Sequence, residues 1–148
     1  MKRIAAQMTA VAAVAAAALS GGCVTPQQSA AADVNPASWY DAAEIVIPNA
    51  DTVTLRDIGL FLRCNDRFAE DTLTVRVAVC TPDSLRHEEP FLLAVRRTEG
   101  PTALTGETDI PYRSRVRFSH AGDYRFRITP SRPVRGIEAV GIHIVKSE

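Results

Sequence analysis

Side chains that could carry out chemistry are few in this sequence, and they lie far apart. His87, His120 and His143 do not show the spacing of metal ligands. The acids in residues 66–71 could approach a calcium ion, but they lack the ligand spacing of a calcium loop, which favours solvated turn acids. No Gly-x-Ser-x-Gly elbow, phosphate-binding loop or paired-cysteine zinc motif is present. The sequence therefore predicts a protein that is not an enzyme and holds neither a metal nor a cofactor.

Cys23 is the residue with the most specific predicted chemistry. Residues 1–22 have a basic start, an alanine- and valine-rich stretch at 4–19 and two glycines before Cys23, as in a bacterial lipoprotein signal peptide. Ser20 stands where such signals usually carry leucine. The apolar stretch is too short and weak for a spanning helix. We therefore expect cleavage before Cys23 and lipidation of Cys23, which would anchor the chain to a membrane. Ordinary secretion with cleavage nearby is the alternative.

Two further cysteines, Cys64 and Cys80, fall in segments that alternate as β-strands do. The alternation over residues 58–64 turns Cys64 inward, whereas that over 72–80 turns Cys80 outward. If these segments form a hairpin, about 26 Å of strand separates the two cysteines, at about 3.3 Å per residue. A disulfide needs Cα atoms within about 7 Å of each other. We therefore predict two free thiols.

Arginines alternate with apolar residues in the stretch RVRFSHAGDYRFRI, residues 115–128. We interpret it as a hairpin with the loop HAG, in which Gly122 takes the position that requires a positive φ. This register would place arginines of both strands on one outer face, consisting of Arg113, Arg115, Arg117, Arg125 and Arg127. Like charges on opposite strands repel each other. The face is either solvated, which is the commoner case, or a docking surface for an acidic protein, an anionic headgroup or a glycan.

The rest of the chain predicts strands separated by turns. Small polar residues at 23–38 predict a lipidated flexible tether, and Trp39 after it is expected to cap one end of the core. The alternation of the following segments changes phase near Asp57, which predicts a β-bulge or a strand break. About seven to eight strands without a helical period predict a single antiparallel β-sandwich at residues 39–148, either jelly-roll or immunoglobulin-like.

The charge balance argues against one class of partner. The chain has 17 Lys and Arg residues and 17 Asp and Glu residues, so its formal net charge is zero. A protein that binds nucleic acid is expected to carry a basic excess. We therefore expect the protein to contact a membrane, through the lipid on Cys23, and not to bind nucleic acid.

Three segments resemble the GldH-type gliding-motility lipoproteins of Bacteroidetes. The first is the lipoprotein start followed by SWYDAAEIVI at residues 38–47, with a tryptophan shortly before the first strand. The second is LFLRCNDRFAEDTLTVRVAVCTPDS at 60–84, and the third is FSHAGDYRFRITPSRPVRGIEAVGIHIVKS at 118–147. The loop TEGPTALTG at 98–106 departs from the family because it lacks an expected tryptophan.

The resemblance implies a function in the cell envelope. Members of this family are not known as enzymes; they are envelope lipoproteins needed for gliding and for the linked type IX secretion machinery, and relatives occur in bacteria that do not glide. The resemblance thus implies an outer-membrane lipoprotein that is an accessory or assembly factor of an envelope protein complex. No acidic residue directly follows Cys23, which favours the periplasmic side. The alternative is a sandwich that binds a glycan or another small ligand, which would need an exposed aromatic platform.

Overall fold

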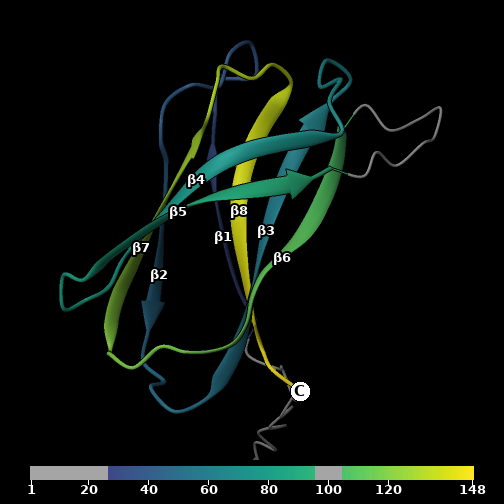
Figure 1. Ribbon diagram of the computed structural model, residues 1–148. Helices are drawn as coiled ribbons and strands as arrows, with labels where there is room; N and C mark the ends of the chain where they lie inside the picture. The colour runs from purple at the N-terminus through teal and green to yellow at the C-terminus, as the bar shows by residue number, and fades with distance from the viewer. Residues whose placement is uncertain (1–26, 96–104) are drawn as a thin grey trace, which may run out of the picture.

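The computed structural model describes residues 27–95 and 105–148, and all regular structure within them is β (Figure 1). No helix in these two ranges is long and apolar enough to cross a membrane. The first sheet has the strand order β1-β8-β3-β6 and the second has the order β2-β7-β4-β5. The predicted antiparallel β-sandwich is confirmed. The strands are β1 (Gln28–Asp33), β2 (Ala43–Asn49), β3 (Leu55–Asn65), β4 (Thr72–Cys80), β5 (Arg86–Ala94), β6 (Thr105–Arg117), β7 (Gly122–Pro130) and β8 (Ile137–Lys146).

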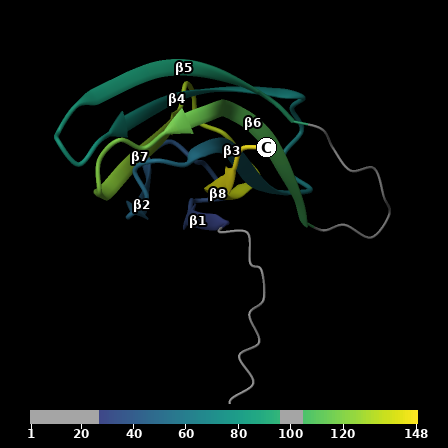
Figure 2. The same cartoon turned by 90° about the horizontal axis from the view of Figure 1, so that it is seen from below.

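The connections between the strands are those of a jelly-roll. Along the chain each strand is followed by one in the opposite sheet, apart from β4 and β5, which are neighbours in the second sheet. Figure 2 shows β4 and β5 on one side of the molecule and β8 and β1 on the other. Of the two predicted sandwich types, jelly-roll and immunoglobulin-like, the structure therefore has the jelly-roll.

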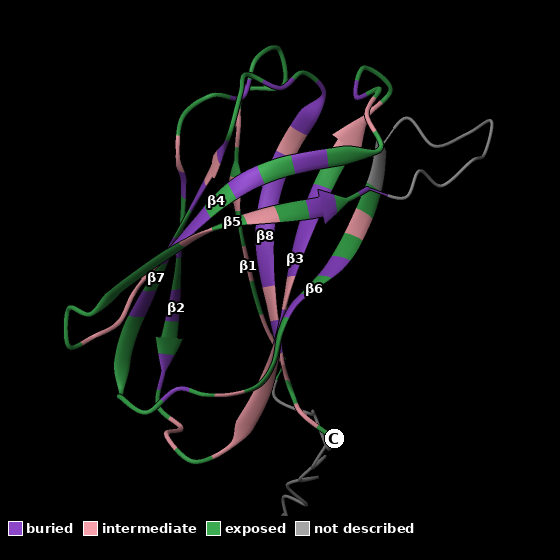
Figure 3. Ribbon diagram, viewed as in Figure 1, coloured by how far each residue is buried: buried purple, intermediate pink, exposed green. Residues whose placement is uncertain are grey.

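The core lies between the sheets and follows the alternation of the sequence (Figure 3). Every second residue of β2 is buried, and β7 alternates in the same way from Tyr124 to Ile128. Trp39 is only 2% exposed, and its indole N–H donates to the carbonyl of Asp41 at 2.8 Å. The main chain of Trp39 forms an isolated bridge with Val134, which leads into the last strand. The prediction that Trp39 caps the core is confirmed.

The folded domain begins earlier than the sequence predicted. Residues 28–33, expected to be part of a flexible tether, form β1 and pair with β8 from Ala139 to Ile144. Ala30 and Ala32 are half-buried and pack against the core. The prediction of a tether through residue 38 is therefore wrong. Small alanine side chains give little hydrophobic signal, whereas the main-chain hydrogen bonds of the ladder do not depend on side-chain type.

The hairpin predicted for residues 115–128 does not form. β6 lies in the first sheet beside β3, and β7 lies in the second sheet between β2 and β4. Arg117 is consequently opposite Leu55 and not opposite Arg125. Gly122 does have a positive φ, of 125°, as predicted, but it follows a crossover between sheets. Alternation predicts which way a side chain faces, and it does not predict which strand becomes the neighbour.

A β-bulge does lie beside Asp57, but it is in β6 and not in the segment whose change of phase predicted it, since β3 pairs with β8 in unbroken register from Arg56 to Arg63. The register shifts between Arg56 and Ile58, where β6 contributes an extra residue. Arg115 adopts a positive φ of 56° there and donates its main-chain N–H to Asp57 Oδ1 at 2.8 Å. The hydroxyl of Ser147 donates to the same oxygen at 2.6 Å. These hydrogen bonds, from Ser147 first and then from Arg115, hold the pKa of Asp57 below its usual range.

Cys64 and Cys80 are both free, as predicted. The facing directions were also predicted correctly, because Cys64 packs against the core and Cys80 lines a hollow on the outer face of the second sheet. The hairpin used to argue for their separation is wrong, since β3 and β4 belong to different sheets. The two cysteines are thus kept apart by the layers of the sandwich.

The Cys64 thiol is expected to resist alkylation in the native protein. Burial, with a smaller contribution from Glu138, raises the pKa of Cys64 to about 11. At pH 8 only about one thiol in a thousand would then be ionised, and the alkylation rate should rise about tenfold per pH unit. Iodoacetamide labelling followed by mass spectrometry measures this rate, with urea-unfolded protein as the fast control. Equal labelling rates in native and unfolded protein would contradict the prediction.

Candidate functional site

The structure separates the five arginines that were predicted to share one face. Arg113, Arg115 and Arg117 belong to β6 in the first sheet. Arg125 and Arg127 belong to β7 in the second sheet. The predicted five-arginine face is therefore wrong, because the strands that carry it do not pair. The predicted lipidation site at residue 23 lies outside the described residues.

Arg113 is bound within the domain. Its guanidinium contacts Glu89 of β5 and lies 5.0 Å from the centre of the Tyr112 ring. The Tyr112 hydroxyl also donates to Glu89, at 2.6 Å. Burial first, and then this hydrogen bond, raise the pKa of Tyr112, while the hydrogen bond from Tyr112 is the main cause of the lowered pKa of Glu89. Arg113 therefore stabilises the contact between two edge strands and is not free for a partner.

Arg113 and Arg117 border an apolar groove of about 310 Å³. The groove lies between β6 and the turn that joins β4 to β5, and Val79, Val116 and Phe118 contribute to its walls. β5 and β6 are edge strands of their sheets, so the sandwich is open along this side. Arg113 and Arg117 thus belong to an apolar opening between the sheets and not to a basic face.

Arg125 and Arg127 lie on a different basic surface, on the outer face of the second sheet. In the ladder, Ala78 of β4 is opposite Arg127, and Cys80 is opposite both Arg125 of β7 and Arg86 of β5. Ala78 is only 9% exposed although it points away from the core, because long side chains stand around it. We call this surface the arginine-ringed hollow; it consists of Ala78 and the four arginines Arg76, Arg86, Arg125 and Arg127.

The arginines of the hollow outnumber the acids that bind them. Glu44 accepts from Arg125 at 3.3 Å and lies 3.9 Å from Arg127. Glu88 pairs with Arg76 at 3.1 Å. The guanidinium group of Arg86 has no hydrogen-bond or ion-pair partner within residues 27–95 and 105–148. Exposed ion pairs of this kind contribute about 0–1 kcal/mol each, so an incoming anion can replace them.

The arginine-ringed hollow has room for a ligand. An open volume of about 640 Å³ lies beside Ala78 and continues past Thr74 and Pro90 to Tyr40. A smaller volume of about 180 Å³ adjoins it, bordered by Arg86 and Arg125. Tyr40 is 64% exposed and stands at the rim. The hollow therefore combines guanidinium groups, hydroxyl groups and one accessible aromatic ring.

Arg76 and Arg86 were not identified as site residues from the sequence. The outward facing of Arg76 was predictable, because Arg76 alternates with the buried Val75 and Val77 of β4. What joins them to Arg125 and Arg127 is the pairing of β4 with β7 and of β4 with β5. The first of these pairings connects segments that are far apart in the sequence, so local alternation could not indicate it.

A second polar cluster lies on the outer face of the first sheet. Glu107, Asp109 and His143 present ligand atoms within 4.8 Å of one another, and His143 Nε2 is 3.1 Å from Asp109. The His143 ring stacks on Phe61, with ring centres 4.3 Å apart. Metal binding through Nε2 would leave the ring proton on Nδ1, which is buried without an acceptor. Arg63 also lies 3.8 Å from Glu107. When Nε2 instead contacts Asp109, Nδ1 needs no proton, so the cluster fits a histidine–carboxylate contact better than a metal site.

The acids considered for calcium do not gather around a common point in the structure. Glu70 contacts Arg132, whose hydrogen bond is the main cause of the lowered pKa of Glu70. Asp71 contributes its main-chain carbonyl, which accepts from Val95 at 2.8 Å. Glu70 therefore joins two connections at one end of the sandwich.

Comparison with known proteins identifies no family. No protein-family model matches this chain, and no curated protein matches its sequence. Among solved structures, the chain is similar to dimeric latent PorU from Porphyromonas gingivalis, with a TM-score of 0.36 and 8% identity. The match covers 82% of this chain and only 13% of that one. A likeness at this level carries no argument about function.

Proposed function

We propose that this chain is a lipid-anchored protein of the bacterial envelope that acts without catalysis, as an accessory or assembly factor of the gliding-motility and type IX secretion machinery. The lipoprotein-like start of the sequence and the resemblance to GldH-type lipoproteins support the proposal. The fold by itself does not, because β-sandwiches carry many unrelated functions.

The observation that carries the proposal is the place where the folded domain begins. β1 begins at Gln28, five residues after Cys23. Five residues span at most about 18 Å when fully extended. A lipid on Cys23 would therefore hold the sandwich close to the membrane, with the end that contains Gln28 facing it. This short distance suits a protein that works within a membrane-bound complex.

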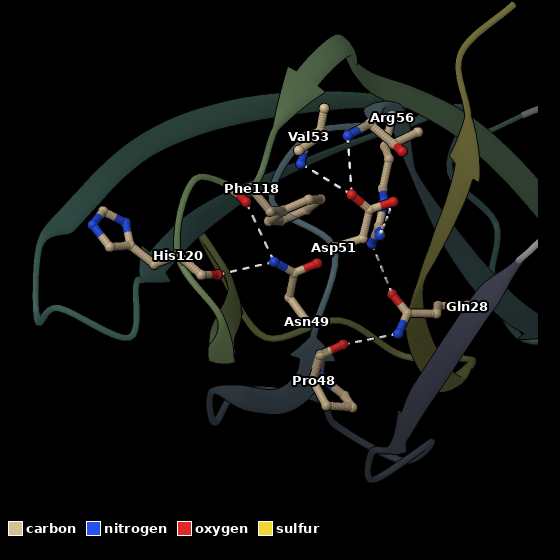
Figure 4. Close-up of polar contacts among 9 residues, drawn as sticks. Gln28, Pro48, Asn49, Asp51, Val53, Arg56, Phe118 and His120 are labelled. Carbon is tan, nitrogen blue, oxygen red and sulfur yellow. Dashed lines mark hydrogen bonds and ion pairs between the residues drawn. The ribbon is translucent and has the colours of Figure 1, made fainter.

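Gln28 is also firmly attached to the rest of the domain (Figure 4). Its amide nitrogen donates to the carbonyl of Pro48 at 2.8 Å, and its amide oxygen accepts from Arg56 at 3.3 Å. The Arg56 guanidinium is 3.6 Å from Asp51 and lies 5.6 Å from the centre of the Phe118 ring. The entry point of the chain is thus connected to both sheets, so an anchor at Cys23 would restrain the whole domain.

Asn49 strengthens the same end of the sandwich. It is 6% exposed, and its side-chain nitrogen donates to the carbonyls of Phe118 at 3.3 Å and His120 at 2.9 Å. These carbonyls belong to the crossover from β6 to β7. Figure 4 shows Asn49 reaching the carbonyls of Phe118 and His120. The proposed membrane-facing end is therefore an ordered surface.

The proposed location is the periplasmic face of the outer membrane. Residues 24–28, VTPQQ, contain no acid that could direct the lipoprotein to the cell surface. Stable anchoring requires two or more acyl chains, as bacterial lipoproteins carry, because a single chain binds only marginally.

The anchor is tested with Cys23→Ala. We expect the variant to move from the membrane fraction to the soluble envelope fraction and to lose labelling by a palmitate analogue, since the lipid is the proposed anchor. Cys80→Ala is the matched control, because it removes an unpaired thiol that lies on the outer face of the domain. A Cys23→Ala protein that stayed fully in the membrane fraction would refute the proposed anchor.

The place in a secretion or gliding complex is tested by crosslinking in native membranes followed by mass spectrometry. Recovery of secretion or motility components with the wild-type protein, and their loss with Cys23→Ala, is the expected result. Recovery of bound oligosaccharide instead would support the alternative, a glycan-binding sandwich. The exposed Tyr40 ring beside the arginine-ringed hollow is the observation that favours this alternative.

A further inference from the structure

We propose that the arginine-ringed hollow binds an extended acidic segment of a partner protein, in which carboxylates occur at alternate residues. This inference rests on the proposed function for one assumption, namely that the partner is a protein of the envelope complex. It assigns the docking surface to Arg76, Arg86, Arg125 and Arg127 instead of the five arginines suggested by the sequence.

The charge of the hollow requires an anionic occupant. Glu44 contacts two arginines and Glu88 contacts one, whereas the guanidinium group of Arg86 has no partner among the described residues. Each guanidinium has five N–H donors and no acceptor, so most donors of the hollow point to solvent. Carboxylates pair with guanidinium groups in planar, two-bonded geometry. The contacts with Glu44 and Glu88 show that carboxylates reach these arginines.

The spacing of the arginines fits an extended chain. Arg125 and Arg127 are separated by one residue on β7, so their side chains repeat at about 6.6 Å, as do alternate residues of an extended peptide. Arg86 is two strands away across β4, at about 10 Å. Cys80 lies directly between Arg125 and Arg86, and the small side chain of Ala78, two residues earlier on β4, lines the open volume of about 640 Å³. A peptide lying there would have guanidinium groups on both sides.

The position and lining of the hollow argue against two other anions. Its larger part extends toward Thr74 and Ser131, at the end where β4 begins and β7 ends. Gln28 and the proposed membrane contact lie at the opposite end, where β8 ends, so a lipid headgroup of the anchoring membrane would not reach this larger part, whereas Arg86 and Arg125, near the starts of β5 and β7, lie closer to that end. A glycan platform needs stacked aromatic rings, and Tyr40 is the only strongly exposed aromatic side chain that the structure describes.

The test measures binding of a fluorescent peptide of alternating glutamate and threonine to the full-length protein in detergent. The hollow variant is Arg86→Gln with Arg127→Gln, and the control is Arg117→Gln with Arg135→Gln, two exposed arginines outside the hollow. The charge change is the same in both. We expect the hollow variant to weaken binding at least about tenfold, from the loss of two charge-assisted contacts, while the control stays within about twofold.

Binding should also weaken as the salt concentration rises, and a lysine–threonine peptide should not bind. The same assay on Cys23→Ala separates this inference from the proposed function, because the hollow does not depend on the lipid. Three results would overturn the inference: no binding of the acidic peptide, equal loss of binding in both double variants, or tighter binding through the hollow of polygalacturonate or phosphatidylglycerol vesicles than of the peptide.

Discussion

Replacing Gly136 with alanine is expected to lower the free energy of unfolding by at least about 3 kcal/mol. Gly136 has a positive φ of 87°, which other residues adopt only with strain. A Cβ at this position would lie 2.2 Å from the main-chain nitrogen of Phe68 and 2.7 Å from the carbonyl carbon of Arg67. Backbone atoms cannot move aside as a flexible side chain can, so the turn after β3 or the start of β8 would have to shift.

The hydrogen bonds of Gly136 make this shift expensive. Its N–H donates to Pro36 at 2.8 Å, and its carbonyl accepts from Asn65 at 2.8 Å. Urea unfolding followed by circular dichroism measures the effect. Gly59→Ala is the control, because a Cβ there would only approach the Ile110 carbonyl, at an ordinary 3.6 Å. If both variants unfolded at the same urea concentration as the wild type, the close approach at Gly136 would be wrong.

Trp39→Ala is expected to lower the free energy of unfolding by about 3–5 kcal/mol, as large-to-small changes of buried aromatic residues do. Trp39 is 2% exposed, and its main-chain N–H and carbonyl are hydrogen-bonded to Val134 at 2.7 and 2.9 Å. These main-chain bonds survive the substitution, so the loss comes from the cavity and from removal of the indole hydrogen bond to Asp41. The carbonyl of Asp41 would be left without that donor.

Circular dichroism is the suitable probe for this variant, because Trp39 is the only tryptophan and the change removes its fluorescence. Tyr40→Ala is the neighbouring control; at 64% exposure its ring contributes little to the core, and the change should stay within about 0.5 kcal/mol. A Trp39→Ala protein as stable as Tyr40→Ala would mean that the indole does not close the end of the sandwich.

Much of the local structure was predictable from the residues themselves. The strict alternation in β2, β4 and β7 predicts buried and exposed faces that the structure confirms. A glycine in a sharp connection predicts the positive φ of Gly122. Each of these properties depends on a few neighbouring residues, and therefore short stretches of sequence carry the information.

The candidate site was less predictable. The outward facing of Arg125 and Arg127 could be deduced from alternation, but their neighbours could not. The sequence suggested that Arg115 and Arg117 lie beside them, whereas the structure places Arg76 and Arg86 there. The error arises from a single connection, because residues 118–121 cross to the other sheet instead of forming a tight hairpin.

The sequence by itself determined the fold class and the facing of side chains, because alternation and turn residues are local, and its signal motif predicts the lipid attachment. Only the tertiary structure decided that β1 joins β8, that β6 and β7 separate, and that four arginines from three strands surround Ala78. The physical reason is that main-chain donors and acceptors are the same in every strand. The partner of a strand is therefore chosen by how two sheets bury all their apolar faces at once, which no single segment encodes.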